Sequence, residues 1–210
     1  MTTQTAAAPD MAQNLELNKG DNFIFAMDVS GSMQMSDCPG NMTRIEFLKE
    51  KVTQFANEAS KYDPDGIDVL AFGHQVTPYE KVTAEKAAST IKTLSAKESA
   101  TQTHLVIKKA WDLHKAGGYQ QTVLFVATDG EPTDRAAVAQ QIRDITHAVK
   151  DEREFNISFL TVGKISADLS TWLTQLDDNL VTAGAKYDIV DVKSLEEVDF
   201  LTAFDGALND

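Results

Sequence analysis

The sequence has few of the features that would place a protein outside the cell or in a membrane. Its 210 residues include one cysteine, Cys38, so no internal disulfide bond can form, which is typical of a reducing compartment. No apolar run approaches the roughly 18 residues that a membrane-spanning helix needs. Residues 1–8 lack the basic and apolar regions of a signal peptide. We therefore expect a cytoplasmic protein without a membrane span.

Positive charge is also scarce. Nineteen Lys and Arg residues against 32 Asp and Glu residues give a formal net charge of −13 at pH 7. Such a surface repels phosphate backbones, so we do not expect nucleic acid as a partner. The length and the hydrophobic fraction of 42% fit one ordinary globular domain. Residues 1–20 are small and polar, so we predict a flexible N-terminal tail followed by one domain over 21–210.

Apolar strand-like runs alternate with amphipathic helical patterns along the rest of the chain. This alternation predicts an α/β fold with a doubly wound, mostly parallel, Rossmann-like sheet in the order 3-2-1-4-5-6 and helices on both faces. Pro78 restricts one weak strand, 75–81, to a short antiparallel edge. We predict the other strands over 22–28, 67–72, 122–127, 156–162 and 187–192, and helices over 43–62, 84–94, 105–114, 135–150, 169–176 and 194–208.

Three oxygen-bearing side chains follow the first predicted strand. Asp28, Ser30 and Ser32 alternate directly at its end, and Gly31 lets the chain turn sharply between them. One carboxylate and two hydroxyls are hard oxygen donors, which suit Mg²⁺ or Mn²⁺ better than zinc or copper. A pattern this short becomes specific only when further oxygen ligands reach the same place.

Two later segments supply such ligands. Asp129 follows the strand over 122–127, which in the predicted order lies beside the first strand at the switch point, where open α/β sheets bind ligands. Thr103 lies in the polar turn that opens the helix over 105–114. We therefore predict a metal site with octahedral oxygen coordination completed by water, formed by Asp28, Ser30, Ser32, Thr103 and Asp129.

Together these motifs resemble the von Willebrand factor type A (VWA) domain family, and the resemblance covers residues 21–208. The family's metal-ion-dependent adhesion site carries Asp-x-Ser-x-Ser, then a threonine, then an aspartate in a Thr-Asp-Gly turn, here Thr128-Asp129-Gly130. The family's threonine usually stands two residues before an apolar position, which Leu105 fills if the threonine is Thr103. Thr101 is the alternative.

The resemblance implies a binding mechanism without turnover. Ser30, Ser32 and Thr103 would coordinate Mg²⁺ (or Mn²⁺ or Ca²⁺) directly, while Asp28 and Asp129 would act mostly through bound water. An ion with few direct anionic ligands stays electrophilic and can accept a carboxylate from an acidic residue of a partner protein. In the family, this ligation can move the last helix.

The loop over 33–42 is longer than the about 2–6 residues that usually connect a strand to a helix. It begins immediately after the presumed metal ligands. We therefore expect it to shape which partner reaches the ion.

We expect a metal-dependent protein-binding adaptor and not an enzyme. Intracellular prokaryotic relatives often work beside chaperone-like ATPases or in stress responses. One alternative is a Mg²⁺-dependent hydrolase of a Rossmann-like class, but the haloacid dehalogenase type needs Asp-x-Asp, and Ser30 stands at its second position. The chain also has no Gly-Lys-Ser/Thr phosphate loop, no Gly-x-Ser-x-Gly elbow and no Gly-x-Gly-x-x-Gly. The other alternative is a structural domain with a vacant metal site.

Overall fold

One six-stranded sheet forms the centre of the molecule. The computed structural model describes residues 21–60, 65–119 and 121–197. The strands are ordered β3-β2-β1-β4-β5-β6, and only the edge pair β2–β3 is antiparallel within this sheet. This confirms the predicted fold class and strand order. The strands are β1 (Asp21–Asp28), β2 (Ile67–Phe72), β3 (Val76–Val82), β4 (Gln121–Thr128), β5 (Phe155–Thr161) and β6 (Val190–Ser194).

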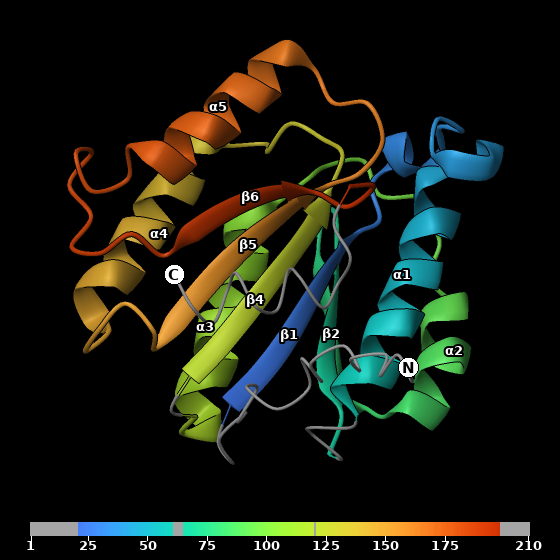
Figure 1. Cartoon of the computed structure of the whole chain (residues 1–210), viewed down its shortest axis with the longest axis horizontal. Helices are drawn as coiled ribbons and strands as arrows, with labels where there is room; N and C mark the ends of the chain where they lie inside the picture. Colours follow the sequence, from blue (N-terminus) through green and yellow to red (C-terminus); the bar gives the residue numbers. More distant parts are fainter. Residues whose placement is uncertain (1–20, 61–64, 120, 198–210) are drawn as a thin grey trace, which may run out of the picture.

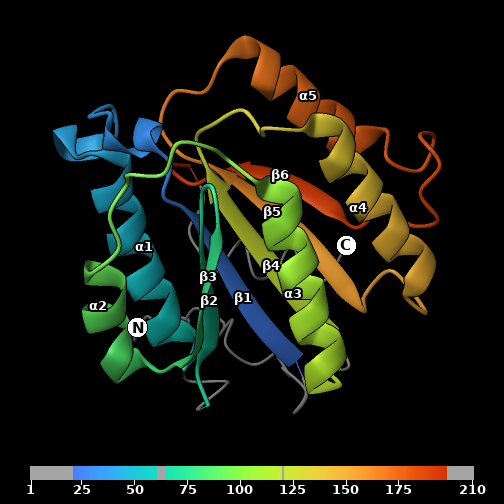
Figure 2. The same cartoon turned by 180° about the vertical axis from the view of Figure 1, so that it is seen from behind.

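Helices cover both faces of the sheet (Figures 1 and 2). Helices α1 (Arg44–Ala59) and α2 (Ala84–Lys92) lie on one face, and α3 (Thr103–Gly117), α4 (Arg135–Ala148) and α5 (Ala167–Asp178) lie on the other. Two short 3-10 helices, Gly31–Gln34 and Pro39–Asn41, interrupt the loop between β1 and α1. No helix in the described ranges is both long and apolar enough to cross a membrane.

The alternation of side chains along β1 divides the core into two layers. Phe23, Phe25 and Met27 pack beneath α1 and α2, while Ile24 and Ala26 face α3, α4 and α5. All five are at most 1% exposed. Since successive residues of a strand point to opposite faces, a continuous apolar run is what a sheet covered on both sides requires.

Local capping signals set where several helices begin and end. At the start of α1, the Thr43 side chain accepts a hydrogen bond from the Glu46 N–H and the Glu46 carboxylate accepts one from the Thr43 N–H, the capping box that the sequence predicts. Asp134 caps α4 by accepting from the Ala137 N–H at 2.9 Å. Gly118, with φ of 63°, ends α3 in the left-handed conformation.

The predicted C-terminal helix can be followed only at its start. The sequence predicts a helix that begins at Ser194, but Ser194 is the last residue of β6, where it pairs with Thr161 of β5. Leu195 continues this pairing by donating its N–H to the Thr161 carbonyl at 2.9 Å. Residues 195–197 then form a turn. The Ser194 hydroxyl also accepts a hydrogen bond from the Glu196 N–H at 3.3 Å, so strand pairing and a capping contact coexist at this residue. The remainder of the predicted helix lies outside the described residues.

Candidate metal site

The candidate site lies where β1 and β4 end side by side. Parallel pairing aligns Met27 of β1 with Ala127 of β4, so Asp28 and Asp129 emerge next to one another at the same edge of the sheet. After this point β1 leads to α1 on one face and β4 leads to α4 on the other. The two connections diverge, which opens the crevice that doubly wound sheets use for ligands.

Asp28 is completely buried and has hydrogen-bond partners on both carboxylate oxygens. Its Oδ1 accepts from the Ser30 N–H at 2.7 Å, and its Oδ2 accepts from the Thr128 hydroxyl at 2.6 Å. Burial raises the pKa of Asp28 from an ordinary value of 3.8 to about 6, with a smaller contribution from the nearby charge of Asp129. Keeping a carboxylate ionised here costs free energy, so a nearby cation would be stabilising.

A chain of hydroxyl contacts joins the first loop to the second aspartate. The Ser30 and Ser32 hydroxyl oxygens are 3.1 Å apart, and the Ser32 hydroxyl donates to Asp129 Oδ1 at 2.8 Å. Ser30 is buried, whereas Ser32 is exposed. The structure therefore brings together Asp28, Ser30, Ser32 and Asp129, and the site opens to solvent on the Ser32 side.

A short segment between α2 and α3, residues 97–101, holds the loop of Ser30 and Ser32 in place by backbone hydrogen bonds. The Val29 carbonyl accepts hydrogen bonds from the N–H groups of Lys97 and Glu98 at 2.9 and 3.1 Å, and the Glu98 carbonyl accepts one from the Gly31 N–H at 3.0 Å. Three residues later, the Thr101 carbonyl accepts from the Thr133 N–H at 2.9 Å. One stretch of chain therefore holds both the serine loop and the loop that follows Asp129.

The same segment carries both candidate threonines. A Cβ atom built on Gly130 would lie 3.5 Å from Thr101 Oγ1, 3.7 Å from Ser32 Oγ and 3.9 Å from Asp28 Oδ2. Thr101 Oγ1 therefore lies among the other candidate ligands. Thr103 is the first residue of α3 and is 1% exposed, and its buried hydroxyl has no hydrogen-bond partner among the described residues. The Gly130 distances favour Thr101, while the unpartnered hydroxyl keeps Thr103 as a candidate.

The donors present fit a small, hard cation. Ligand oxygens converge on a space that a side chain at position 130 would enter, and one buried hydroxyl lacks a partner. Within the described ranges, no group of three or more His, Cys, Asp or Glu side chains could hold a metal ion. A metal bound here would therefore depend on neutral hydroxyls together with two carboxylates, a donor set suited to Mg²⁺ or Mn²⁺.

Comparison with known protein families shows which family the chain belongs to. A sequence model of the von Willebrand factor type A domain matches residues 22–199. The chain belongs to this family. VWA domains are generally protein-binding modules, often metal-dependent, and not enzymes. A sequence search of curated proteins found no match.

Solved structures share the fold of this VWA domain at low sequence identity. A point mutant of the PilB minor pilin from Streptococcus sanguinis has a TM-score of 0.64 and 11% identity, covering 89% of this chain and 59% of that one. Manganese-loaded TRAP protein from Plasmodium vivax has a TM-score of 0.56 and 12% identity, with coverage of 84% of this chain and 69% of that one. A von Willebrand factor type A protein from Catenulispora acidiphila has a TM-score of 0.56 and 18% identity, with coverage of 90% of this chain and 41% of that one. The chain thus spans 41–69% of these longer proteins.

This VWA domain also carries a buried arginine beside the site, which the sequence pattern did not reveal. Arg44, the first residue of α1, is 3% exposed. Its Nη1 donates to Asp129 Oδ2 at 2.6 Å, and its Nε and Nη2 donate to the two Asp37 oxygens at 2.7 and 2.5 Å. Its Nη2 also donates to the Lys164 carbonyl at 2.9 Å. Neither spacing nor composition indicates this cluster, because Asp129 and Lys164 are distant from Arg44 in sequence.

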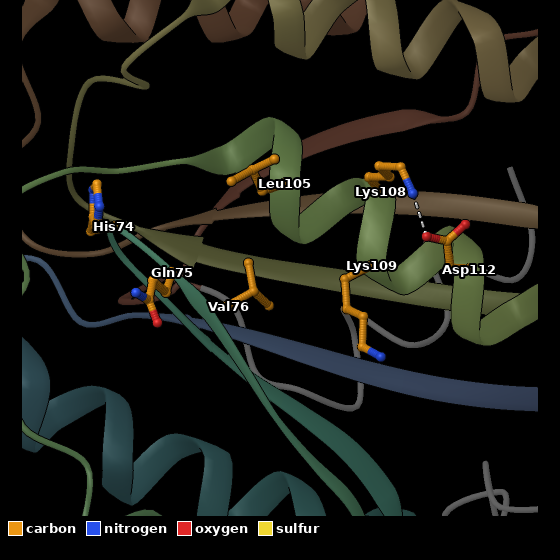
Figure 3. Close-up of a pocket in the computed structure, with 7 residues that line it drawn as sticks. All are labelled: His74, Gln75, Val76, Leu105, Lys108, Lys109 and Asp112. Carbon is orange, nitrogen blue, oxygen red and sulfur yellow. Dashed lines mark hydrogen bonds and ion pairs between the residues drawn. The ribbon is translucent and has the colours of Figure 1, made fainter.

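A separate hollow of about 390 Å³ lies between the β2–β3 turn and α3 (Figure 3). His74 and Leu105 line one part of it, and the ion pair of Lys108 and Asp112, 2.5 Å apart, lines another. Leu105 belongs to α3 and stands two residues after Thr103. The predicted metal ligands do not line it.

Proposed function

We propose that this VWA domain binds a protein partner through a divalent cation held by Asp28, Ser30, Ser32, Asp129 and a threonine. The cation is Mg²⁺, Mn²⁺ or Ca²⁺, and the partner supplies an Asp or Glu carboxylate as a further ligand. The observation that carries this proposal is the convergence of three ligand oxygens, from Thr101, Ser32 and Asp28, around Gly130.

Each ligand residue has a role that follows from its position. The Ser30, Ser32 and threonine hydroxyls present neutral oxygens, whereas Asp28 and Asp129 hold negative charge close by. When bound, the cation supplies an electrophilic position for a carboxylate. Both aspartates are engaged by hydrogen bonds from the protein, so they are held in place and remain available to bind ordered water.

Two exposed apolar side chains stand close in sequence to candidate ligands and guide a proposal on the chemistry of the partner. Met35, in the loop after Ser32, is 53% exposed, and Leu105, near the start of α3, is 38% exposed. We propose that the partner presents an acidic residue beside apolar side chains that cover these two. An adaptor role in the cytoplasm, beside a chaperone-like ATPase in a stress response, belongs to the same proposal.

Calorimetric titration of the chelator-treated protein with Mg²⁺ and Mn²⁺ tests the proposal. We expect saturable one-to-one binding by the wild type and its loss in Asp28→Asn. Asp134→Asn is the matched control, because Asp134 caps α4 and asparagine caps helices equally well. Equal affinity in all three proteins, or no saturable binding by the folded wild type, would overturn the proposal.

The two threonines can be separated by replacing each hydroxyl with a methyl group. We expect Thr101→Val to weaken Mn²⁺ binding by about 10-fold or more, because a direct oxygen ligand is lost. If Thr103 is not a ligand, Thr103→Val leaves binding unchanged and stabilises the fold, since it removes a buried hydroxyl without a partner. The reverse outcome would assign the ligand to Thr103.

A further inference from the structure

The guanidinium of Arg44 lies between two carboxylates, and only one of them belongs to the candidate metal site. Asp129, whose side chain is completely buried, accepts a hydrogen bond from Nη1. Asp37, whose side chain is 18% exposed, accepts hydrogen bonds from Nε and Nη2. Burying an arginine is costly unless its charge and its donors are matched. Here four donor contacts meet that requirement: two to Asp37, one to Asp129 and one to the Lys164 carbonyl.

Asp129 is consequently held at both oxygens. Oδ1 accepts from the Ser32 hydroxyl and Oδ2 accepts from Arg44. A direct bond between Asp129 and a cation would have to compete with the buried ion pair. The positive charge of Arg44 also offsets part of the negative charge that Asp28 and Asp129 place at the site.

We propose that Arg44 is a positioning residue that limits the negative charge acting on the bound cation, through Asp129, and thereby preserves the affinity of that cation for a partner carboxylate. The inference rests on the proposed function. It assigns Arg44 two opposite effects: its charge weakens cation binding and strengthens the subsequent binding of an anion.

The turn after β5 is shaped to admit this cluster. Gly163 has φ of 63°, and a Cβ atom built on it would lie 2.5 Å from Arg44 Nε and 2.6 Å from Asp37 Oδ1. The next residue, Lys164, contributes its carbonyl to Arg44 and its N–H to Asp37 Oδ2 at 3.2 Å. Arg44 therefore joins α1, the loop over 33–42, the β5–α5 turn and Asp129.

Arg44→Gln is the first test, with two readouts on one protein. We expect the Mn²⁺ affinity to rise by about 10-fold, because a positive charge is removed from the neighbourhood of the ion. We expect the affinity of the Mn²⁺-loaded protein for glutamate, measured from the Mn²⁺ electron paramagnetic resonance spectrum, to fall by about the same factor. A purely structural role would lower both affinities together.

Asp37→Asn provides the matched variant of opposite sign. It removes a negative charge from the far side of Arg44 and leaves the ion pair with Asp129 in place. We expect Mn²⁺ affinity to fall by a few-fold and glutamate affinity to rise. This variant also keeps the inference testable if Arg44→Gln fails to fold, because Asp37 is partly exposed.

A glycine pair gives an independent check. Gly163 and Gly118 share a φ of 63°, but a Cβ atom on Gly118 meets nothing within 4 Å. Alanine at either position takes the same positive φ, so a change in Mn²⁺ affinity seen in Gly163→Ala and absent in Gly118→Ala points to displacement of Arg44 and Asp37.

The outcomes separate this inference from the proposed function. Opposite shifts of the two affinities in Arg44→Gln, reversed in Asp37→Asn, support it. Parallel losses of both affinities, with a folded variant by circular dichroism, overturn the role of Arg44 and leave the metal site intact. Absence of saturable Mn²⁺ binding by the wild type overturns both.

Discussion

The two ends of strand β4 bury polar groups in different ways. At its amino end, His114 of α3 is 3% exposed, and its Nδ1 lies 2.8 Å from the Thr122 hydroxyl. The imidazole stacks on Trp111 with ring centroids 5.0 Å apart and meets the edge of Phe155 at 5.6 Å. At the carboxyl end, the candidate ligands bond to one another, and Thr101, Ser32 and Asp28 also present oxygens to the space that a side chain at position 130 would enter.

This difference separates the polar cluster around His114 from the candidate metal site. Burial lowers the pKa of His114, which keeps it neutral and compatible with its aromatic surroundings. Burial raises the pKa of Asp28, and the hydroxyl of Thr103 has no partner in the described part of the chain. The His114 imidazole finds its partners within the protein, at Thr122 and Glu154, although the side-chain nitrogens of Asn22 and Gln121 at the same end have none in the described part of the chain. At the carboxyl end, the oxygens are those of the proposed cation site.

The largest effect on folding should come from His114→Ala. The substitution removes packing against Trp111 and Phe155 and leaves the Thr122 hydroxyl without its partner, so we expect the free energy of unfolding to fall by about 3 kcal/mol. Urea denaturation would measure it. Mn²⁺ affinity should stay unchanged, and a parallel loss of affinity would show that the two ends of β4 are coupled.

Asp28→Asn should have the next largest effect, with the opposite sign for folding. At pH 7 the folded protein holds an ionised carboxylate whose pKa is raised to about 6, so asparagine should stabilise the metal-free protein by about 2 kcal/mol. Thermal unfolding in the presence of a chelator would measure this gain. A loss of stability would mean that Asp28 has a structural role comparable to that of His114.

Asp177→Asn should have the smallest effect and tests a raised pKa away from the site. Burial and the nearby charges of Asp191, Asp178 and Asp188 raise the pKa of Asp177 from 3.8 to about 6. The folded state therefore binds the extra proton, and the carboxylate destabilises the fold as pH rises from about 4 through 6. We expect a gain of about 1 kcal/mol at pH 7.

The gain should disappear below about pH 4, where Asp177 is protonated in both the folded and the unfolded state. Chemical denaturation of Asp177→Asn and wild type at the two pH values would measure it, and Mn²⁺ affinity should not change at pH 7. A gain that persists at low pH would point to packing rather than charge as its cause.

The sequence predicted the fold well because its signals are local and consistent. Continuous apolar runs such as 122–127 marked buried strands, and Thr43 with Glu46 marked the start of α1. The capping pattern at Ser194 does not reveal that this residue also pairs with β5, and most of the predicted last helix lies outside the described residues. The strand predicted over 187–192 occurs as Val190–Ser194, because pairing with β5 sets its bounds.

The candidate site was predictable in part. Asp28, Ser30, Ser32 and Asp129 were found from their positions after strands, and the structure brings them together. The choice between Thr101 and Thr103 depends on the path of a non-repetitive segment, which periodicity does not describe. Arg44 was not found, because its role depends on Asp37, Asp129 and Lys164 meeting in space.

The short segment that begins at Glu98 has a consequence for chain length. It is fastened to the serine loop at Glu98 and to the loop after Asp129 at Thr101, with only two residues between these anchors. Inserting or deleting one residue there would shift Thr101 relative to Ser32 while leaving every ligand residue in the sequence. Such a change should abolish cation binding in a protein that still contains every sequence motif of the site. The length of this segment should therefore indicate cation binding as well as the identity of the ligands does.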